Sequence, residues 1–267
     1  ITGEKFMEHI YPTFERGRIM KKELLWALRD YSYTALQLQY QDYPDGIISG
    51  CRLQARDNML HIGAGMIKCQ NFLFLLQKEE RVRYAPADQY VSLKFRIIKR
   101  EELSDYTRYT TEFALDDRLE RTQNELEICR FKLKEGAGLR TEYKDFYDIQ
   151  TKYDTVNLAD ADWSAQGGRA LSKEVTDYFA KKVLECENAQ DKDIQFAYFL
   201  LHSREAVSYK ILNDYIARKS GNLRSIYAVE GEEAFRKLEE ILDEIRNGRN
   251  FRKSANAVYN ERMIIMD

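Results

Sequence analysis

The stretch YVSLKFRI, from Tyr90 to Ile97, alternates between two kinds of side chain. Apolar side chains stand at every second position, namely Val91, Leu93, Phe95 and Ile97. The positions between them carry Ser92, Lys94 and Arg96. A period of two is typical of a β-strand whose two faces meet different surroundings. The stretch therefore predicts a strand, and it sets the class of this part of the chain.

Two later stretches extend the pattern. YTTEFAL, residues 109–115, alternates in the same way. ELEICRFKL, residues 125–133, begins with Leu126 and Ile128 on one face and then changes phase to Cys129, Phe131 and Leu133. A phase change within one strand indicates a β-bulge or burial on both faces. Several such strands in series predict an antiparallel β domain, a sandwich or a barrel-like sheet.

The hydrophobic period changes to 3.6 after Leu171, which predicts helices. One apolar stripe consists of Leu171, Val175, Phe179, Val183 and Cys186, with Ser172 as an N-cap. The next pattern has a break near His202 and Ser203 and stops at Gly221. The stripe of the last helix consists of Phe235, Leu238, Ile241, Leu242 and Ile245, and Gly248 follows it. A further short helix is predicted near the start, over residues 21–31.

These patterns predict an α+β protein. A short leading helix precedes the antiparallel β domain, and a helical bundle follows it. The expected divisions are residues 1–45 for the helix and an attachment segment, 46–140 for the β domain, 141–170 for an irregular linker, and 171–267 for the helical domain.

The glycine-containing stretch HIGAGMIKCQNFLFLL, residues 61–76, raises the question of a phosphate site. Gly63, Gly65 and Lys68 match neither the dinucleotide fingerprint nor the mononucleotide loop, and the residues after them are β-like instead of helical. We therefore expect a turn between strands, in which one of the two glycines has a positive φ angle. No nucleotide or other cofactor is expected.

Residues of the types that carry chemistry are present but form no recognisable motif. Four cysteines, Cys51, Cys69, Cys129 and Cys186, lack zinc-site spacing and are expected to be buried thiols. The three histidines, His9, His61 and His202, are interpreted as structural or surface residues. The acid pairs Asp116–Asp117 and Asp160/Asp162 are interpreted as turn formers and solvated charges. We therefore name no catalytic and no metal-binding residues.

Charge and hydropathy exclude further classes. The net charge is −2 with 32% charged residues of both signs, which argues against a basic nucleic-acid surface. No segment reaches the roughly 20 apolar residues of a membrane span. The first ten residues, ITGEKFMEHI, do not read as a signal peptide. No nucleic acid, membrane span or small-molecule substrate is expected as a partner.

Four stretches together resemble one family: IYPTFERGRIMKKELLWALRDY (10–31), YQDYPDGIISGCRL (40–53), GAGMIKCQNFLFLL (63–76) and ELEICRFKLKEGAGLRTEYKDFYD (125–148). The chain is similar there to a family from clostridial prophage-type gene clusters. Its members accompany contractile-tail and phage-tail-like bacteriocin genes and are often labelled "DNA and RNA helicase". The second stretch is also similar to attachment domains of tail-fibre and baseplate proteins. The helicase label conflicts with the missing nucleotide loop.

The resemblance implies a structural or adaptor component of a contractile phage tail or phage-tail-like particle, in the baseplate or fibre region. The alternative is a particle-associated hydrolase with an unidentified site. The resemblance also implies that the partners are other tail, baseplate or fibre subunits, in multiple copies. It implies that the chain is synthesised in the cytoplasm and leaves the cell as part of the assembled particle. With 18 tyrosines in the chain, aromatic residues of the polar linker are the candidate interface anchors: Tyr143, Phe146, Tyr147 and Tyr153.

Overall fold

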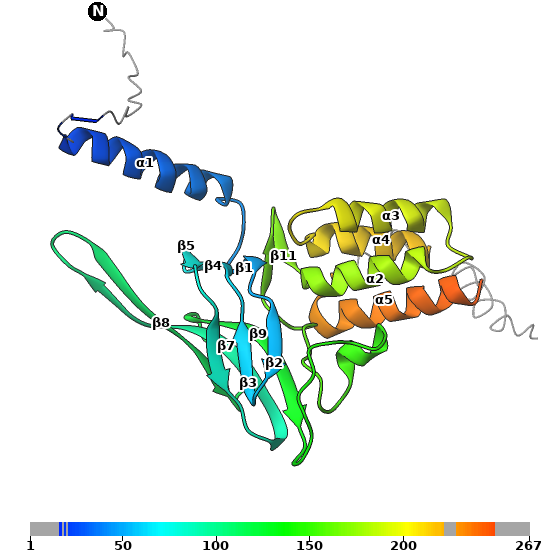
Figure 1. The fold of residues 1–267 in the computed structure, drawn as a ribbon. Helices are drawn as coiled ribbons and strands as arrows, with labels where there is room; N and C mark the ends of the chain where they lie inside the picture. Colours follow the sequence, from blue (N-terminus) through cyan, green and yellow to red (C-terminus); the bar gives the residue numbers. More distant parts are fainter. Residues whose placement is uncertain (1–15, 18, 20, 222–227, 249–267) are drawn as a thin grey trace, which may run out of the picture. The chain divides into compact units, whose positions relative to one another are not determined.

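A computed structural model describes residues 16–17, 19, 21–221 and 228–248 (Figure 1). The chain divides into two compact units, Ile1–Asp42 and Tyr43–Asp267. Helix α1, Lys22–Gln39, belongs to the first unit and is longer than the predicted residues 21–31. Neither glycine nor proline occurs between Gly17 and Pro44, so nothing in the backbone stops the helix at Tyr31. Of the predicted helix and attachment segment, residues 1–45, the first 15 residues lie outside the described residues.

The second unit contains strands followed by helices, so the α+β class and its order are confirmed. A five-stranded sheet has the order β11-β10-β1-β4-β5. Its strands are β1 Gly46–Gly50, β4 Gly65–Cys69, β5 Phe72–Leu76, β10 Trp163–Ala165 and β11 Gly168–Ala170. The β1–β10 pair is parallel and the other pairs are antiparallel. β10 and β11 lie within residues 141–170, where no regular element was predicted.

Two three-stranded antiparallel sheets complete the β part. One has the order β2-β3-β6, with β2 Leu53–Arg56, β3 Met59–Ile62 and β6 Glu80–Arg83. The other has the order β8-β7-β9, with β7 Ala87–Glu102, β8 Thr107–Asp116 and β9 Glu125–Leu133. The tight turn of β2–β3 places Asp57 and Asn58 at positive φ, the conformation that a two-residue hairpin turn requires.

Strand β7 confirms the predicted strand at Tyr90–Ile97, but both of its faces are covered there. Lys94 and Ser92 are as fully buried as Leu93 and Phe95. The predicted phase change of β9 is also confirmed as a bulge, because Leu93 pairs with Cys129 whereas Lys94 pairs with Glu127. Ile128 is thus the extra residue, and Leu126 to Cys129 are all buried.

The connection at Gly63 joins β3 to β4, and strand β5 follows, so the expected turn between strands is confirmed. The expected positive φ angle is wrong: neither Gly63 nor Gly65 has one, whereas Gly50 has φ +70°. Gly65 lies directly opposite Gly50 in the β1–β4 ladder. A Cβ atom on Gly65 would lie 2.5 Å from the Cys51 amide nitrogen and 2.6 Å from the Ser49 carbonyl oxygen. Close approach of two backbones therefore selects this glycine.

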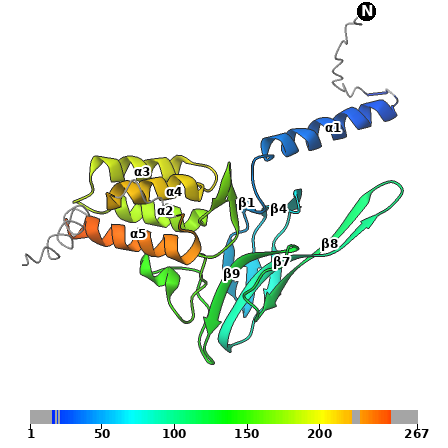
Figure 2. The same ribbon diagram turned by 180° about the vertical axis from the view of Figure 1, so that it is seen from behind.

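Four helices follow the strands: α2 Lys173–Leu184, α3 Asp191–His202, α4 Tyr209–Ser220 and α5 Gly231–Arg246. They gather on one side of the β part in both views (Figures 1 and 2). The predicted break near His202 and the stop at Gly221, which has φ +70°, are confirmed. Ser172 is the N-cap of α2 by position, but its side chain makes no capping hydrogen bond.

One hydrophobic core runs from the sheets into the helices. It includes Phe95 of β7, Phe131 of β9, Phe179 of α2 and Phe235 of α5. Residues 141–170 contribute to it through side chains that are at most 7% exposed: Phe146, Ile149, Val156, Leu158, Ala159, Ala161, Trp163, Ala165 and Ala170. The division at 140 and 170 into β and helical domains stays a prediction.

Candidate functional site

Two of the predicted interface residues contact the helices from the segment before the 3₁₀ helix Tyr147–Gln150. Phe146 is fully buried and stacks on Phe235, with ring centroids 4.6 Å apart. Tyr143 is half-buried, and its hydroxyl donates to the Val156 carbonyl oxygen at 2.7 Å. Burial raises the pKa of Tyr143 far above its usual value. Both residues thus have contacts within this chain.

The other two predicted residues are also half-buried. The Tyr147 hydroxyl donates to the Asp243 carboxylate of α5, and burial followed by this contact raises the pKa of Tyr147 to about 12. Tyr153 lies between Lys132 and Lys134, whose ammonium groups are 4.8 Å and 4.1 Å from the ring centroid. A role of any of the four in binding a partner stays a prediction.

Tyr143 also borders a groove of about 830 Å³ between β2 and residues 139–144. The charged residues that line this groove are Arg52, Arg56, Arg140, Lys144, Glu142 and Glu174. Arg140 makes a bidentate pair with Asp148, with both contacts at 2.8 Å. The Thr141 hydroxyl accepts a long hydrogen bond, 3.4 Å, from the Ala55 amide of β2.

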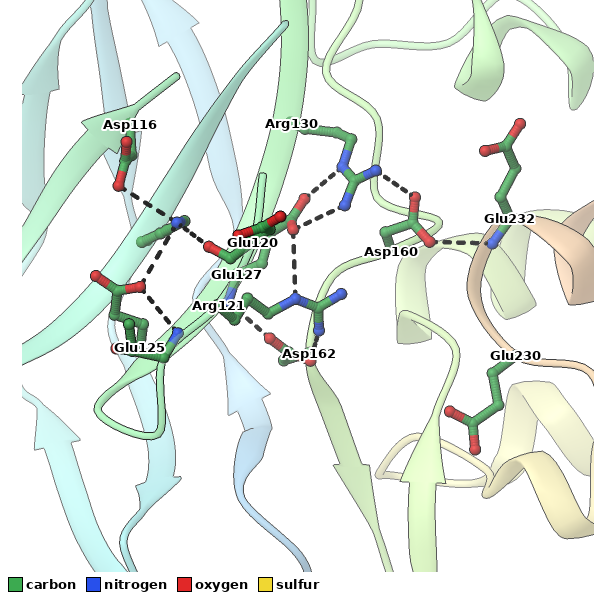
Figure 3. Close-up of polar contacts among 12 residues, drawn as sticks. Asp116, Glu120, Arg121, Glu125, Glu127, Arg130, Asp160, Asp162, Glu230 and Glu232 are labelled. Atoms are coloured by element: carbon green, nitrogen blue, oxygen red, sulfur yellow. Dashed lines mark hydrogen bonds and ion pairs between the residues drawn. The ribbon is translucent and has the colours of Figure 1, made fainter. Parts of the chain in front are cut away.

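A cluster of buried charges joins the β part to the helices (Figure 3). Glu127 of β9 is fully buried and pairs with Arg130 at 2.6 Å. Arg130 also reaches Asp160 at 2.9 Å. The other carboxylate oxygen of Asp160 accepts a hydrogen bond of 3.2 Å from the Glu232 amide in the first turn of α5. This chain of contacts leads from β9, at the edge of its sheet, to a helix N-terminus, where a negative charge is favourable.

Asp162 is at the centre of a second group of ion pairs in the same cluster. It accepts contacts from Arg121 and Arg169, and Arg169 also pairs with Glu230 at 3.0 Å. Asp162 is only 5% exposed, so its interpretation as a solvated charge is wrong. Its charge is balanced by Arg121, 41 residues earlier in the chain, and by Arg169 of the neighbouring strand β11, and no local pattern reveals either pair.

A third group of ion pairs surrounds Lys94. Its ammonium group donates to the Glu120 carbonyl oxygen at 2.6 Å and pairs with Asp116 at 3.3 Å. Burial raises the pKa of the Asp116 carboxyl, but hydrogen bonds from Arg118 and Lys94 outweigh that effect and hold the pKa well below its usual value. The solvated reading is therefore wrong for Asp116 as well, whose side chain is 8% exposed.

The paired charges of this cluster connect strand β9 to the first turn of α5. Burial raises the pKa of the Glu127 carboxyl, although Arg130 opposes the effect. Each buried carboxylate described above faces a guanidinium or ammonium group, which offsets part of the cost of burying its charge. The sequence signal that was available is the position of Glu127 between Leu126 and Ile128, beside the change of phase in β9.

The remaining residues of interest have structural partners. Lys68 is 4% exposed and donates to the Tyr43 carbonyl oxygen at 2.7 Å. His61 is buried beside Glu79, and His202 contacts the Tyr198 carbonyl oxygen at 2.9 Å, whereas His9 lies outside the described residues. The cysteines are free thiols, with Cys51, Cys69 and Cys129 buried and Cys186 partly exposed. Burial raises the pKa of both Cys51 and Cys69 to about 12.

A two-stranded ribbon projects from the sheet (Figures 1 and 2). β9 pairs with β7 only as far as Arg96, whereas β8 pairs with β7 as far as Glu102. The ribbon closes with a turn in which the Leu103 amide donates to the Tyr106 carbonyl oxygen at 2.9 Å. Leu103 is 46% exposed and Tyr106 53% exposed. The tip of the ribbon thus presents two large apolar side chains to solvent.

Within the ranges that the structure describes, no group of three or more His, Cys, Asp or Glu residues is arranged to hold a metal ion. Among those same residues, no helix has the length and hydropathy needed to span a membrane.

Comparison with known proteins gives only distant likenesses. No family model and no curated protein matches the chain. A chain of the type VI secretion system TssK-TssF-TssG baseplate subcomplex is similar at TM-score 0.41 and 10% identity over 90% of this chain and 100% of that one. A crystal structure of TssK is similar at TM-score 0.38 and 8% identity, over 90% of this chain and 69% of that one. A chain of a baseplate complex from the type VI secretion system is similar at TM-score 0.39 and 10% identity, over 90% of this chain and 70% of that one. The similar structures are thus baseplate proteins of a contractile system, and at these scores they carry no conclusion about the activity of this chain.

Proposed function

We propose that this chain is a structural or adaptor subunit of a contractile phage tail or phage-tail-like particle, in the baseplate or fibre region. It acts by binding other tail, baseplate or fibre subunits through protein–protein interfaces. The particle setting is taken from the sequence resemblance. The mode of action is argued from the ribbon of β7 and β8.

The ribbon is the observation that carries the proposal. An isolated two-stranded hairpin has little stability in water. Beyond Arg96, β7 no longer pairs with β9, so the ribbon consists of β7 and β8 alone. It nevertheless exposes Leu103 and Tyr106 at its tip. Exposed aromatic and aliphatic side chains on a projecting element are typical of interface anchors. We therefore assign the tip to contact with a neighbouring subunit.

The stem of the ribbon suits an element that stays soluble before assembly. Lys99 pairs with Glu101 at 2.6 Å and Arg100 with Glu102 at 2.7 Å. Charged side chains along a strand oppose indiscriminate pairing of its open edges. Specific contact is thereby left to the tip.

The test is complementation of a strain from which the gene has been deleted. The double variant Leu103→Ser/Tyr106→Ser should fold normally but fail to enter particles. The matched control Tyr198→Ser/Ile211→Ser removes two side chains of similar exposure, 51% and 45%, from helices α3 and α4. It should restore particles. Imaging of the particles and immunoblotting of purified particles for this chain provide the measurements.

Two results would contradict the proposal. Intact particles that kill target cells after deletion of the gene would show that the chain is not a required component. Normal incorporation of the tip variant would remove the ribbon from the interface. Tyr153→Ala offers a separate test of the predicted anchors, because this side chain, unlike Phe146, lies outside the core.

A further inference from the structure

Helix α1 is an 18-residue helix without a single buried residue. An isolated helix of this length is only marginally stable in water, because most helical stability in proteins comes from packing of an apolar face. Its large apolar side chains are nevertheless numerous, and those that are 45% to 63% exposed are Leu25, Trp26, Leu28, Tyr31, Tyr33 and Leu38. The composition of α1 is therefore that of a helix that is covered in its working state.

Five residues of α1 follow a heptad, whereas Trp26, Tyr33 and Leu36 lie on the outer face. Leu24, Tyr31 and Leu38 are spaced by seven, and Leu28 and Ala35 lie four residues after the first and second of them. The alternating spacings of four and three place these five residues at positions d and a of a coiled-coil repeat. They form one continuous seam along the whole helix.

The charges of α1 avoid this seam. Its charged residues are Lys22, Glu23, Arg29 and Asp30, and all four fall at the outer positions b and c. The positions that flank the seam, e and g, carry Leu25, Ala27, Ser32, Thr34 and Gln39. In a pair of identical helices, charged e and g positions repel each other wherever the facing charges have the same sign. Here these positions are uncharged, so the surface is compatible with a second copy of itself.

We propose that α1 is a self-association element, in which the a/d seam of one copy packs against the same seam of further copies of this chain. The inference goes beyond the proposed function and does not depend on it, because it concerns the purified chain alone. At the first e and g positions, Leu25 and Ala27 widen the apolar face beyond the a/d stripe, whereas the later e and g positions are polar and uncharged.

Three other occupants compete with a second copy. They are a helix of another protein, the remainder of this chain, and solvent. Each of these leaves the purified chain monomeric. If a second copy covers α1, the measured mass of the purified chain rises with concentration, and substitutions in the seam reduce it.

The first experiment measures the mass of the purified full chain by sedimentation over a wide range of concentrations. We expect oligomers that dissociate on dilution. The variant Leu28→Glu/Leu38→Glu places carboxylates in the seam and should weaken self-association by at least about 100-fold. The control Trp26→Glu/Gln37→Glu adds the same two charges at the outer positions f and c, and it should change self-association by less than about 3-fold.

The second experiment detects the seam directly and does not require a disruptive variant. Tyr31→Cys, at a d position near the middle of α1, should form an intermolecular disulfide under mild oxidation in a Cys186→Ser background. Tyr33→Cys, on the opposite face, should cross-link at least about 10-fold more slowly, because its sulfur points away from the seam. Circular dichroism of each variant checks that the rest of the chain remains folded.

A monomer at every concentration would overturn the proposal. Oligomers that persist in the seam variant, or equal cross-linking at both positions, would locate self-association elsewhere in the chain. Failure of the ribbon variant to enter particles is a separate result, since that variant leaves α1 intact.

Discussion

At the scale of single residues, Gly65 shows how a position can demand glycine without demanding an unusual backbone angle. Its place opposite Gly50 brings the main chains of β4 and the end of β1 within van der Waals distance. A Cβ atom there would lie 2.5 Å from the Cys51 amide nitrogen and 2.6 Å from the Cys51 sulfur. The obstacle includes backbone, so it cannot rotate aside.

We expect Gly65→Ala to lower the free energy of unfolding by about 1–3 kcal/mol, since an added methyl group in a closely packed position forces the backbone apart. Gly138→Ala is the matched control, because a Cβ at Gly138 would meet nothing within 4 Å. Urea denaturation of both variants measures the difference. Equal stability of the two would show that β1 and β4 separate without cost.

A second residue-scale prediction concerns pH. Burial, and then the nearby Asp243 carboxylate, raises the pKa of Glu239 from 4.5 to about 7. Because the folded state holds this proton more tightly than the unfolded state, Glu239 costs no stability below pH 4.5. The cost grows as the pH rises from about 4.5 to about 7 and is constant above that range.

Glu239→Gln should therefore raise the melting temperature at pH 8 but not at pH 4. Glu239 is half-exposed, so we discount for solvent screening and expect a gain on the order of 1 kcal/mol. Glu233→Gln, in the first turn of the same helix, removes a carboxylate that favours the helix N-terminus and should lower stability slightly. A gain of the same size for both variants would point to net charge instead of the surroundings of Glu239.

At the scale of elements, the Glu127–Arg130–Asp160 contacts link strand β9 to the first turn of α5. Arg130→Met leaves Glu127 buried without its closest partner, and Arg121, at 3.6 Å, is the remaining cation nearby. We expect a loss of about 3–5 kcal/mol, as is usual when one member of a buried pair is removed.

The double variant Glu127→Met/Arg130→Met removes the uncompensated charge together with its partner. It should be more stable than Arg130→Met alone, because burying two apolar side chains avoids the desolvation of an isolated carboxylate. Chemical denaturation of Glu127→Met, Arg130→Met and the double variant completes the cycle. Additive losses would show that the two side chains do not interact.

The elements themselves could be predicted from local patterns. The alternation of Tyr90–Ile97, the phase change at Ile128 and the stripe of α5 each express a period that neighbouring residues alone determine. Their partners could not be predicted in the same way. Asp160 accepts a hydrogen bond from a residue 72 positions later in the chain, and β10 pairs with β1 across an even longer interval. Short strands such as Trp163–Ala165 owe their existence to those partners and carry too few residues to show a period.

At the scale of the whole molecule, residues 141–170 join the β part to the helices, and their apolar side chains belong to the core that both parts share. The polar composition of this segment suggested a linker, yet its few apolar residues contribute to the common core. Aromatic residues in a polar segment are compatible with interface anchors and with core anchors alike, and sequence alone could not separate the two for Phe146. An architectural division at 140 and 170 does not require that the two parts unfold independently.

Phe146 offers the test. It stacks on Phe235 of α5, lies 5.7 Å from the ring of Phe179 in α2, and is fully buried. Phe146→Ala should cost about 3–5 kcal/mol, the usual loss for a large core aromatic. Tyr153→Ala is the control from the same segment and should cost no more than about 1 kcal/mol, because its main contacts are partly solvated lysines. Because one core spans both parts, we expect calorimetry to show a single transition that moves to lower temperature as a whole in Phe146→Ala. Two transitions, with only one of them shifted, would show instead that the segment is a linker between independently stable domains.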